Sequence, residues 1–215
     1  MSRRVSTPWI AAALALAALS LAPAPALSEG AIEKIVFVRH GEKPALGLGQ
    51  LNCRGLNRAL ALPGVIAKAW GKPDLIFAPD PAQAKDDVGV AYDYVRPLAT
   101  IEPTAVRFGM PVDAHIGFSN VAALQAALED PANRGALIVV AWEHKIIDVV
   151  VRALLAAHGG DATAAPAWAD DDFDSVDVVT IDWSGEKAQA KFERAKEGLD
   201  GQSDVCPSQR VSPPE

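Results

Sequence analysis

The sequence lacks an excess of positive charge. Its 20 lysines and arginines are outnumbered by 27 aspartates and glutamates, and the formal net charge at pH 7 is −7. Proteins that bind a nucleic-acid backbone or an anionic lipid surface need a basic footprint to neutralise phosphate groups. The charge therefore argues against a nucleic-acid partner, and any phosphate site must be a local island of positive side chains.

Long apolar runs are also scarce, and positions 9–21 hold the longest. This run follows two arginines, and two prolines interrupt the small residues behind it. The order of basic, apolar and small residues is typical of a secretory signal peptide. The run is also shorter than the roughly 20 residues that span a bilayer. We therefore expect a signal peptide at residues 1–28, a periplasmic or secreted protein, and no stable membrane insertion after signal removal.

Cysteine is limited to Cys53 and Cys206, and the sequence has neither a CxxC pair nor a histidine cluster. A metal site of the cysteine–histidine type is therefore not expected. In an oxidising compartment two cysteines far apart in the sequence more often pair than stay free. We predict a Cys53–Cys206 disulfide that ties the polar tail at residues 201–215 to the domain. The acidic run at residues 170–172 lacks the features of a calcium loop and is interpreted as a solvated loop.

Apolar residues recur in patterns typical of alternating strands and helices. Short apolar runs predict buried strands at residues 32–38, 74–78 and 136–142. Helical spacing predicts helices at residues 55–70, 92–106, 118–128 and 145–157. Two alternating segments predict an antiparallel hairpin at residues 176–183 and 188–195. This order predicts a single three-layer α/β domain at residues 29–200, with a mainly parallel central sheet and an antiparallel edge hairpin near the C-terminus.

Two local signals refine the helices. Pro63 and Gly64 favour an interruption of the first helix, because proline cannot donate a backbone hydrogen bond. Ser119 is a candidate N-cap for the third helix, because a serine side chain can accept from a free amide of the first turn.

Two of the predicted strands run directly into a histidine. Residues 32–38 are followed by Arg39 and His40, and residues 136–142 are followed by Glu143 and His144. Ligands of open α/β sheets bind outside the carboxyl ends of the strands. If the two strands are parallel neighbours, both histidines lie on one catalytic rim.

Four ordered segments resemble the histidine phosphatase superfamily, in its phosphoglycerate mutase-like branch. Residues 38–43 (VRHGEK) resemble the Arg-His-Gly signature, and residues 51–59 (LNCRGLNRA) look like the Leu-Thr-x-x-Gly-x-x-Arg-Ala segment. Arg96, with the threonine and proline four and seven positions later, matches the spacing of the second arginine motif. Residues 139–144 are similar to the strand that delivers the second histidine. A lone Arg-His-Gly is weak, but four segments in order are specific.

The resemblance implies an exported phosphomonoesterase that needs no metal and no cofactor. His40 would be the nucleophile and form a phosphohistidine that water hydrolyses. Arg39 and Arg96 would bind the non-bridging phosphoryl oxygens, because guanidinium matches phosphate bidentately. His144 would donate to the same oxygens. Because a neutral imidazole is needed, we expect activity to fall in acid where His40 gains a proton.

Other features of the family pattern stay open. Residues 78–94 look like a lengthened loop before the second arginine. The general acid has three candidates, Glu143, Glu102 and Asp113, and Glu42 and Lys43 are candidate substrate contacts. A phosphoglycerate-type mutase and a catalytically silent phosphate-binding module remain alternatives. The expected partner is a phosphorylated small molecule or envelope component, and the sequence does not indicate the oligomeric state.

Overall fold

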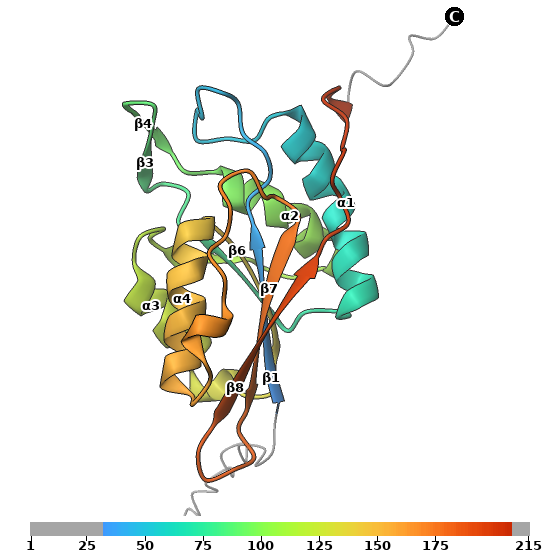
Figure 1. The fold of residues 1–215 in the computed structure, drawn as a ribbon. Coiled ribbons are helices and arrows are strands. Elements are labelled where there is room, and N and C mark those ends of the chain that lie inside the picture. The colour runs from blue at the N-terminus through green and yellow to red at the C-terminus, as the bar shows by residue number, and fades with distance from the viewer. Residues whose placement is uncertain (1–31, 208–215) are drawn as a thin grey trace, which may run out of the picture.

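The structure, a computed structural model, describes residues 32–207 (Figure 1). The signal peptide expected at residues 1–28 and the tail beyond residue 207 lie outside the described residues. The strands are β1 (Ile32–Arg39), β2 (Leu75–Pro79), β3 (Ala84–Asp87), β4 (Val90–Asp93), β5 (Asp113–Ile116), β6 (Leu137–Trp142), β7 (Ser175–Asp182) and β8 (Gln189–Lys196). The helices are α1 (Cys53–Ala69), α2 (Arg96–Phe108), α3 (Val121–Leu128) and α4 (His144–Ala157), with short 3₁₀ turns η1 (Pro131–Asn133) and η2 (Ala162–Ala164). Within the described range, no helix has the length and hydrophobicity of a membrane span.

The main sheet has six strands in the order β5-β2-β6-β1-β7-β8. Parallel pairing joins β5, β2, β6 and β1, whereas β7 runs antiparallel between β1 and β8. The predicted α/β class, with a mainly parallel sheet and an antiparallel hairpin near the C-terminus, is confirmed. Strand β5 was not predicted, since four residues of mixed polarity give little periodic signal.

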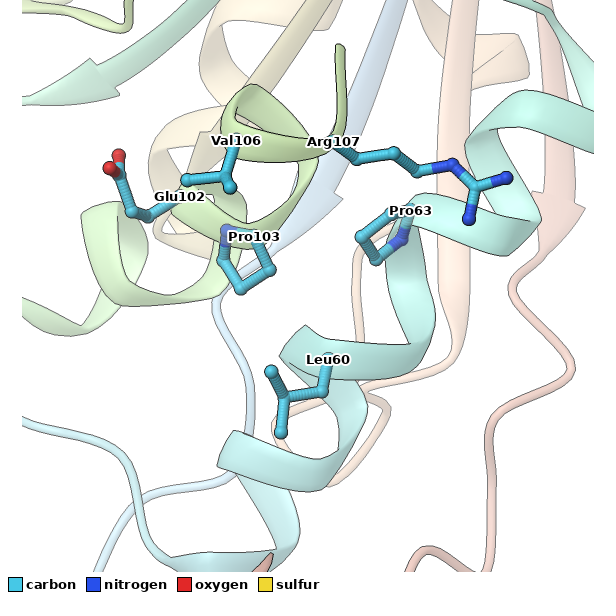
Figure 2. Close-up of a pocket in the computed structure, with 6 residues that line it drawn as sticks. All are labelled: Leu60, Pro63, Glu102, Pro103, Val106 and Arg107. Carbon is cyan, nitrogen blue, oxygen red and sulfur yellow. The ribbon is translucent and has the colours of Figure 1, made fainter. Parts of the chain in front are cut away.

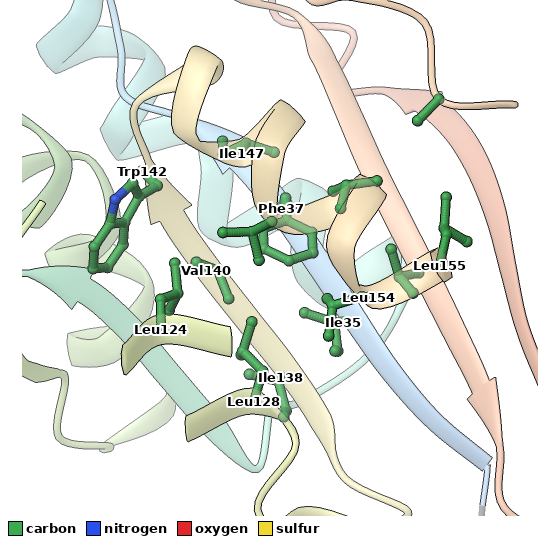
Figure 3. Packing of buried hydrophobic residues seen from close by; sticks show 14 of the residues in the cluster. Ile35, Phe37, Leu124, Leu128, Ile138, Val140, Trp142, Ile147, Leu154 and Leu155 are labelled. Carbon is green, nitrogen blue, oxygen red and sulfur yellow. The ribbon is translucent and has the colours of Figure 1, made fainter. Parts of the chain in front are cut away.

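Both faces of the sheet are covered by helices. Along β1, Ile35 and Phe37 point to one face and Val36 and Val38 to the other, as the two-residue period of a strand requires. The first pair packs in a cluster with α3 and α4 (Figure 3), and the second packs with α1 and α2. Burial on both faces holds β1 and β6 rigidly side by side, which fixes where their carboxyl ends lie.

Helices α1 and α2 each contain prolines near a predicted boundary. α1 continues through Pro63, so the predicted interruption is wrong. The neighbouring Leu62 and Ile66 are buried in the core, and this packing keeps the helix continuous. α2 begins at Arg96 rather than at residue 92, because Pro97 fits the first turn, where its missing N–H is not needed.

The segment expected to be a lengthened loop contains the hairpin β3–β4. Its turn is formed by Val88 and Gly89, whose φ angles of 55° and 80° are in the left-handed region that two-residue hairpin turns use. Strand β3 reads Ala-Lys-Asp-Asp, a polar run that gives no strand signal. The N-cap prediction for α3 is also wrong by one residue, because Asn120 rather than Ser119 caps this helix.

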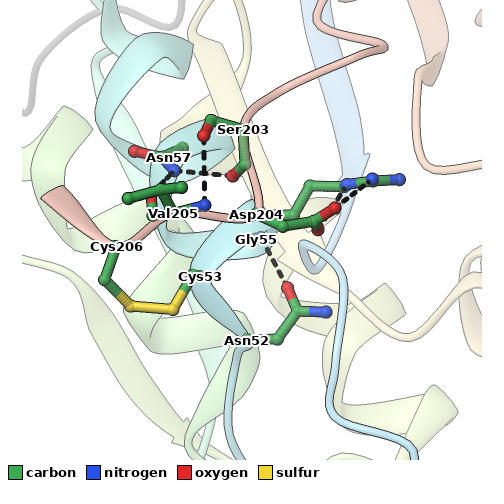
Figure 4. The surroundings of a disulfide bond; sticks show 9 residues. Asn52, Cys53, Gly55, Asn57, Ser203, Asp204, Val205 and Cys206 are labelled. Carbon is green, nitrogen blue, oxygen red and sulfur yellow. Dashed lines mark hydrogen bonds and ion pairs between the residues drawn. A yellow bond between two sulfur atoms is a disulfide. The ribbon is translucent and has the colours of Figure 1, made fainter. Parts of the chain in front are cut away.

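The Cys53–Cys206 disulfide is present, as predicted (Figure 4). It joins the first residue of α1 to the C-terminal segment across 153 positions of sequence. The Asn57 side chain donates to the carbonyls of Ser203 and Val205 at 2.8 and 2.9 Å. The tail up to Cys206 is therefore fixed to α1 by covalent and polar contacts.

Replacing both cysteines by serine is expected to lower the free energy of unfolding by about 2–4 kcal/mol, because the bond closes a very long loop in the unfolded chain. Chemical denaturation of the parent and the double variant measures this difference. Reduction of the disulfide in the parent should shift the denaturation midpoint as far as the double substitution does. Equal midpoints for all three samples would contradict the prediction.

Candidate active site

A cavity of about 350 Å³ opens at the carboxyl ends of β1 and β6. Its lining residues are Arg39, His40, Lys43, Lys85, Asp86, Asp87, Val88, Arg96, Glu143, His144, Lys145 and Asp170. Five of these side chains are cations and four are carboxylates, in a chain whose net charge is −7. The cavity is therefore the local positive island that a phosphate site in this acidic protein requires.

Strand pairing brings the two histidines to this cavity. Arg39 is the register partner of Trp142 in the parallel pair β1–β6, and the His40 amide donates to the Trp142 carbonyl at 3.0 Å. His40 follows the end of β1, and His144 is the first residue of α4. The sequence prediction that both histidines lie on one rim is thus met by the geometry.

His40 is almost fully buried and its ring is held in one orientation. Nδ1 lies 2.8 Å from the carbonyl oxygen of Gly41, which can only accept, so Nδ1 carries the proton and Nε2 has the free lone pair. The Gly41 amide donates to Thr100 Oγ1 at 2.9 Å. A Cβ on Gly55 would collide with the backbone of Glu42, so this glycine lets α1 approach the loop closely.

Burial lowers the pKa of His40 to about 3. The Gly41 carbonyl opposes this shift, and the guanidiniums of Arg96 and Arg39 add to it. The imidazole is consequently neutral at every pH well above 3. This corrects the expectation of acid inactivation near the ordinary histidine pKa, because the surroundings move the protonation of His40 far into acid.

We therefore expect the His40 ring to stay neutral from pH 5 to pH 8, because its pKa of about 3 lies below this window. Histidine-selective NMR of the ligand-free protein measures this directly, since ring carbon shifts follow protonation. A titration midpoint above pH 5 for His40 would contradict the structure. The His40→Asn variant assigns the signal.

Arg39 is buried beside His40, and no carboxylate of the described part of the chain pairs with it. Its Nη1 donates to the carbonyls of Ala169 and Asp172 at 3.2 and 2.8 Å, and its guanidinium carbon lies 3.9 Å from the Phe173 ring centroid. Burial lowers the pKa of Arg39 from its ordinary value. Within residues 32–207, no carboxylate oxygen lies within 4.0 Å of this guanidinium. Its charge is therefore available to an anionic ligand.

His144 is flanked by two carboxylates. Its Nε2 lies 2.8 Å from Asp170 Oδ1, and its Nδ1 lies 2.9 Å from Glu143 Oε1. The other oxygen of Glu143 accepts from the Ile146 amide at 3.1 Å and caps α4. Burial by itself would raise the pKa of Glu143, but the contacts with His144 and the charge of Lys85 lower it to about 2. Glu143 is thus an ionised cap that orients His144, which does not suit a proton donor.

Arg96 reaches the cavity but is already bound to a carboxylate. Its Nη2 lies 2.7 Å from both Oδ atoms of Asp87, and its Nη1 donates to the Gly47 carbonyl at 3.3 Å. Lys43, a predicted substrate contact, also lines the cavity, with its Nζ 3.6 Å from Asp87 Oδ1. Asp87 therefore offsets the charges of Arg96 and Lys43, which the sequence analysis expected to bind the substrate.

Three predicted residues are not brought to the cavity. Glu102 lies on α2 and lines a different, largely apolar hollow between α1 and α2 (Figure 2). Asp113 is the first residue of β5, at the opposite end of that strand, and contacts His115 at 2.9 Å. Glu42 points to the buried Arg58, with a separation of 2.8 Å. None of the three therefore lines the cavity that holds His40 and His144.

Lys85, Asp87 and Asp170 are among the lining residues that could not be identified from the sequence. Lys85 and Asp87 belong to the hairpin in the expected loop, and Asp170 belongs to the acidic run interpreted as solvated. Hairpin residues contact the cavity only through tertiary structure. Asp170 differs from the neighbouring aspartates by its contacts with His144 and Lys145. These contacts depend on the fold, so the sequence around Asp170 carries little information about them.

The sequence matches no protein-family model and no curated protein. Its fold is similar to a Nakamurella multipartitia protein proposed to be the phosphohistidine phosphatase SixA, with a TM-score of 0.51 and 14% identity over 75% of this chain and 95% of that one. It is similar also to the mycobacterial glucosyl-3-phosphoglycerate phosphatase in complex with inorganic phosphate, with a TM-score of 0.52 and 16% identity over the same shares. The chain therefore shares its fold with these two proteins.

Proposed function

We propose that this chain is a phosphatase that hydrolyses a phosphate monoester through a phosphohistidine on His40. The observation that carries the proposal is the buried, neutral His40 ring, whose Nδ1 proton is fixed on Gly41 while the cavity holds Arg39 and His144 beside it. The shared fold supports this reading, because both solved structures compared above are described as phosphatases.

The chemistry follows from the free lone pair on Nε2. The lone pair attacks phosphorus, a nitrogen–phosphorus bond forms, and the bond to the leaving oxygen breaks with its electron pair on that oxygen. Water then attacks phosphorus, the nitrogen–phosphorus bond breaks, and inorganic phosphate leaves while His40 regains its lone pair. Arg39 offsets the phosphoryl charge. In this proposal His144 donates to a phosphoryl oxygen after its Nε2 gives up the 2.8 Å contact with the exposed Asp170 carboxylate. The positive groups come from side chains, so the proposed mechanism uses no metal.

Three of the four carboxyls that line the cavity do not suit a proton donor for the leaving group. The pKa of Glu143 is about 2. Burial would raise the pKa of Asp87, but Arg96 and the Gly49 amide lower it, and contacts with His144 and Lys145 lower that of Asp170. These carboxyls are ionised at neutral pH. We therefore propose that the enzyme favours phosphate esters whose leaving oxygen is stable without a proton, such as aryl phosphates.

The test is hydrolysis of p-nitrophenyl phosphate by the purified protein, together with binding of inorganic phosphate. We expect turnover that inorganic phosphate inhibits competitively. Phosphate binding without turnover would indicate a silent binding module, and phosphoryl transfer to a sugar acid in preference to water would indicate a mutase. Either result would contradict the proposed phosphatase.

We further propose that the protein acts outside the cytoplasm on a phosphorylated small molecule or envelope component. A structural disulfide supports this location, because such bonds persist in oxidising compartments. Fractionation of cells that express the full chain tests it, and recovery of the protein only from the cytosol would contradict it.

A further inference from the structure

The hairpin β3–β4 forms one wall of the active-site cavity. Its residues Lys85, Asp86, Asp87 and Val88 all line the cavity, although only a loop was expected at this place in the sequence. The hairpin stands beside the cavity end of the sheet in Figure 1. It is therefore the element that can adjust the charge around His40 without altering the sheet.

The hairpin residue Asp87 forms an ion pair with Arg96, one of the two arginines expected to bind phosphate. Asp87 is buried, accepts from Arg96 Nη2 with both carboxylate oxygens at 2.7 Å, and accepts from the Gly49 amide at 3.0 Å. Lys43 Nζ is 3.6 Å from the same carboxylate. A phosphate monoester carries close to two negative charges near neutral pH, so a pocket in which Asp87 offsets Arg96 needs a second free cation besides Arg39.

Lys85 is that second cation. Within residues 32–207, no carboxylate oxygen lies within 4.0 Å of its Nζ. The half-buried side chain instead places Nζ 5.2 Å from the Tyr94 ring centroid and 5.1 Å from that of Phe118. The two rings contact each other edge to face at 5.3 Å, and the Trp142 indole donates to the Phe118 carbonyl at 2.8 Å. This aromatic support, Tyr94 and Phe118, fixes the lysine without neutralising it.

The aromatic support also relates Lys85 to the nucleophile. The Tyr94 ring centroid is 6.1 Å from that of His40, and the Phe173 ring centroid, which lies 3.9 Å from the Arg39 guanidinium carbon, is 6.2 Å from that of His40. Each free cation of the cavity thus rests on an aromatic ring that contacts His40. Both cations line the same cavity as His40.

We infer that Lys85 is a substrate-binding residue that contacts the phosphoryl oxygens together with Arg39, while Arg96 holds Asp87 and the hairpin in place. This inference rests on the proposed phosphatase function. A lysine acts on phosphate as a point charge and does not require the bidentate geometry of an arginine. Its hairpin position means that the second phosphate-binding charge comes from the lengthened segment rather than from α2.

The test compares Lys85→Met and Lys85→Arg with the parent. The control is Lys191→Met, a lysine exposed on β8. We expect Lys85→Met to lower kcat/KM for p-nitrophenyl phosphate by about 10²-fold, the usual effect of one lost charge-stabilising donor, and to weaken competitive inhibition by inorganic phosphate about tenfold. Lys85→Arg should recover most of both losses, because the charge returns. Lys191→Met should match the parent.

Thermal unfolding distinguishes binding from a structural role. A Lys85→Met protein with a lower Tm but unchanged inhibition by phosphate would overturn the inference, and so would values of kcat/KM within twofold of the parent. Either outcome would leave the phosphatase proposal intact, because the parent remains active. A parent that neither hydrolyses p-nitrophenyl phosphate nor binds inorganic phosphate would overturn both proposals together.

Discussion

Replacing His40 by alanine is expected to lower kcat/KM for p-nitrophenyl phosphate by at least about 10⁴-fold, as removal of a nucleophile does in other covalent mechanisms. The reason is the geometry of the ring. Its Nδ1 is committed to the Gly41 carbonyl at 2.8 Å, and burial keeps Nε2 unprotonated by lowering the pKa to about 3. Steady-state kinetics with equal amounts of folded protein measure the loss.

His115→Ala is the matched control for this experiment. His115 is exposed, contacts Asp113 within β5, and does not line the active-site cavity. We expect its kcat/KM to remain within twofold of the parent. Circular dichroism of both variants excludes a general loss of folding. A His40→Ala protein that keeps one tenth of the parent activity would remove His40 as the nucleophile.

The second large effect is expected on stability, at Arg58. Only 1% of its side chain is exposed, and it lies 2.8 Å from Glu42 and 2.6 Å from Glu197. Asp174 is 3.6 Å away. Burial raises the pKa of Glu197 and the charge of Arg58 opposes this shift, so the Glu197 carboxyl depends on Arg58 to be ionised in the core. The Arg58→Met variant would leave the buried carboxyl of Glu197 and the largely buried carboxyl of Glu42 without their cation. We expect its free energy of unfolding to be lower by about 3–5 kcal/mol.

Arg54→Met provides the comparison, one turn earlier on the same helix. Arg54 pairs at 2.7 Å with Asp204, whose side chain is 72% exposed. Solvent screens such a pair, so its loss should not change the unfolding midpoint measurably. Chemical denaturation at pH 7 compares the two variants. Equal, small effects at both positions would show that the buried cluster around Arg58 does not hold the C-terminal segment to α1.

Arg58 also links this stability to the active site. Glu42 lies two positions after His40, and Arg58 holds it with two hydrogen bonds at 3.0 and 2.8 Å. Glu197 follows β8, so the same guanidinium joins the catalytic loop, α1 and the end of the sheet. The sequence suggested Glu42 as a substrate contact. The structure instead gives it the task of supporting the loop that carries His40.

The strand-to-histidine arrangement could be predicted because it depends on local sequence. Apolar runs of the right length predict β1 and β6, and parallel pairing then places whatever follows each strand at one edge. The disulfide could also be predicted, because a chain with two cysteines, Cys53 and Cys206, allows only one pairing. The two-residue alternation along β7 and β8 identified their hairpin for the same local reason.

The charge balance of the site could not be predicted, because it depends on contacts between distant segments. Glu143 is unsuited to donate a proton only because His144 and Lys85 lower its pKa. Arg96 is occupied only because β3 places Asp87 against it. Strand β3 reads Ala-Lys-Asp-Asp and strand β4 reads Val-Ala-Tyr-Asp, and four residues that do not alternate in polarity give no period-two signal.

Trapping of the covalent intermediate tests the central claim most directly. The parent is mixed with p-nitrophenyl phosphate, quenched in alkali within a single turnover, digested, and examined by mass spectrometry for the peptide that contains His40. We predict one added phosphoryl group on His40, lost on exposure to acid, and absent from the His40→Ala protein. A phosphoryl group on another residue, or full turnover with no covalent intermediate, would contradict nucleophilic catalysis by His40.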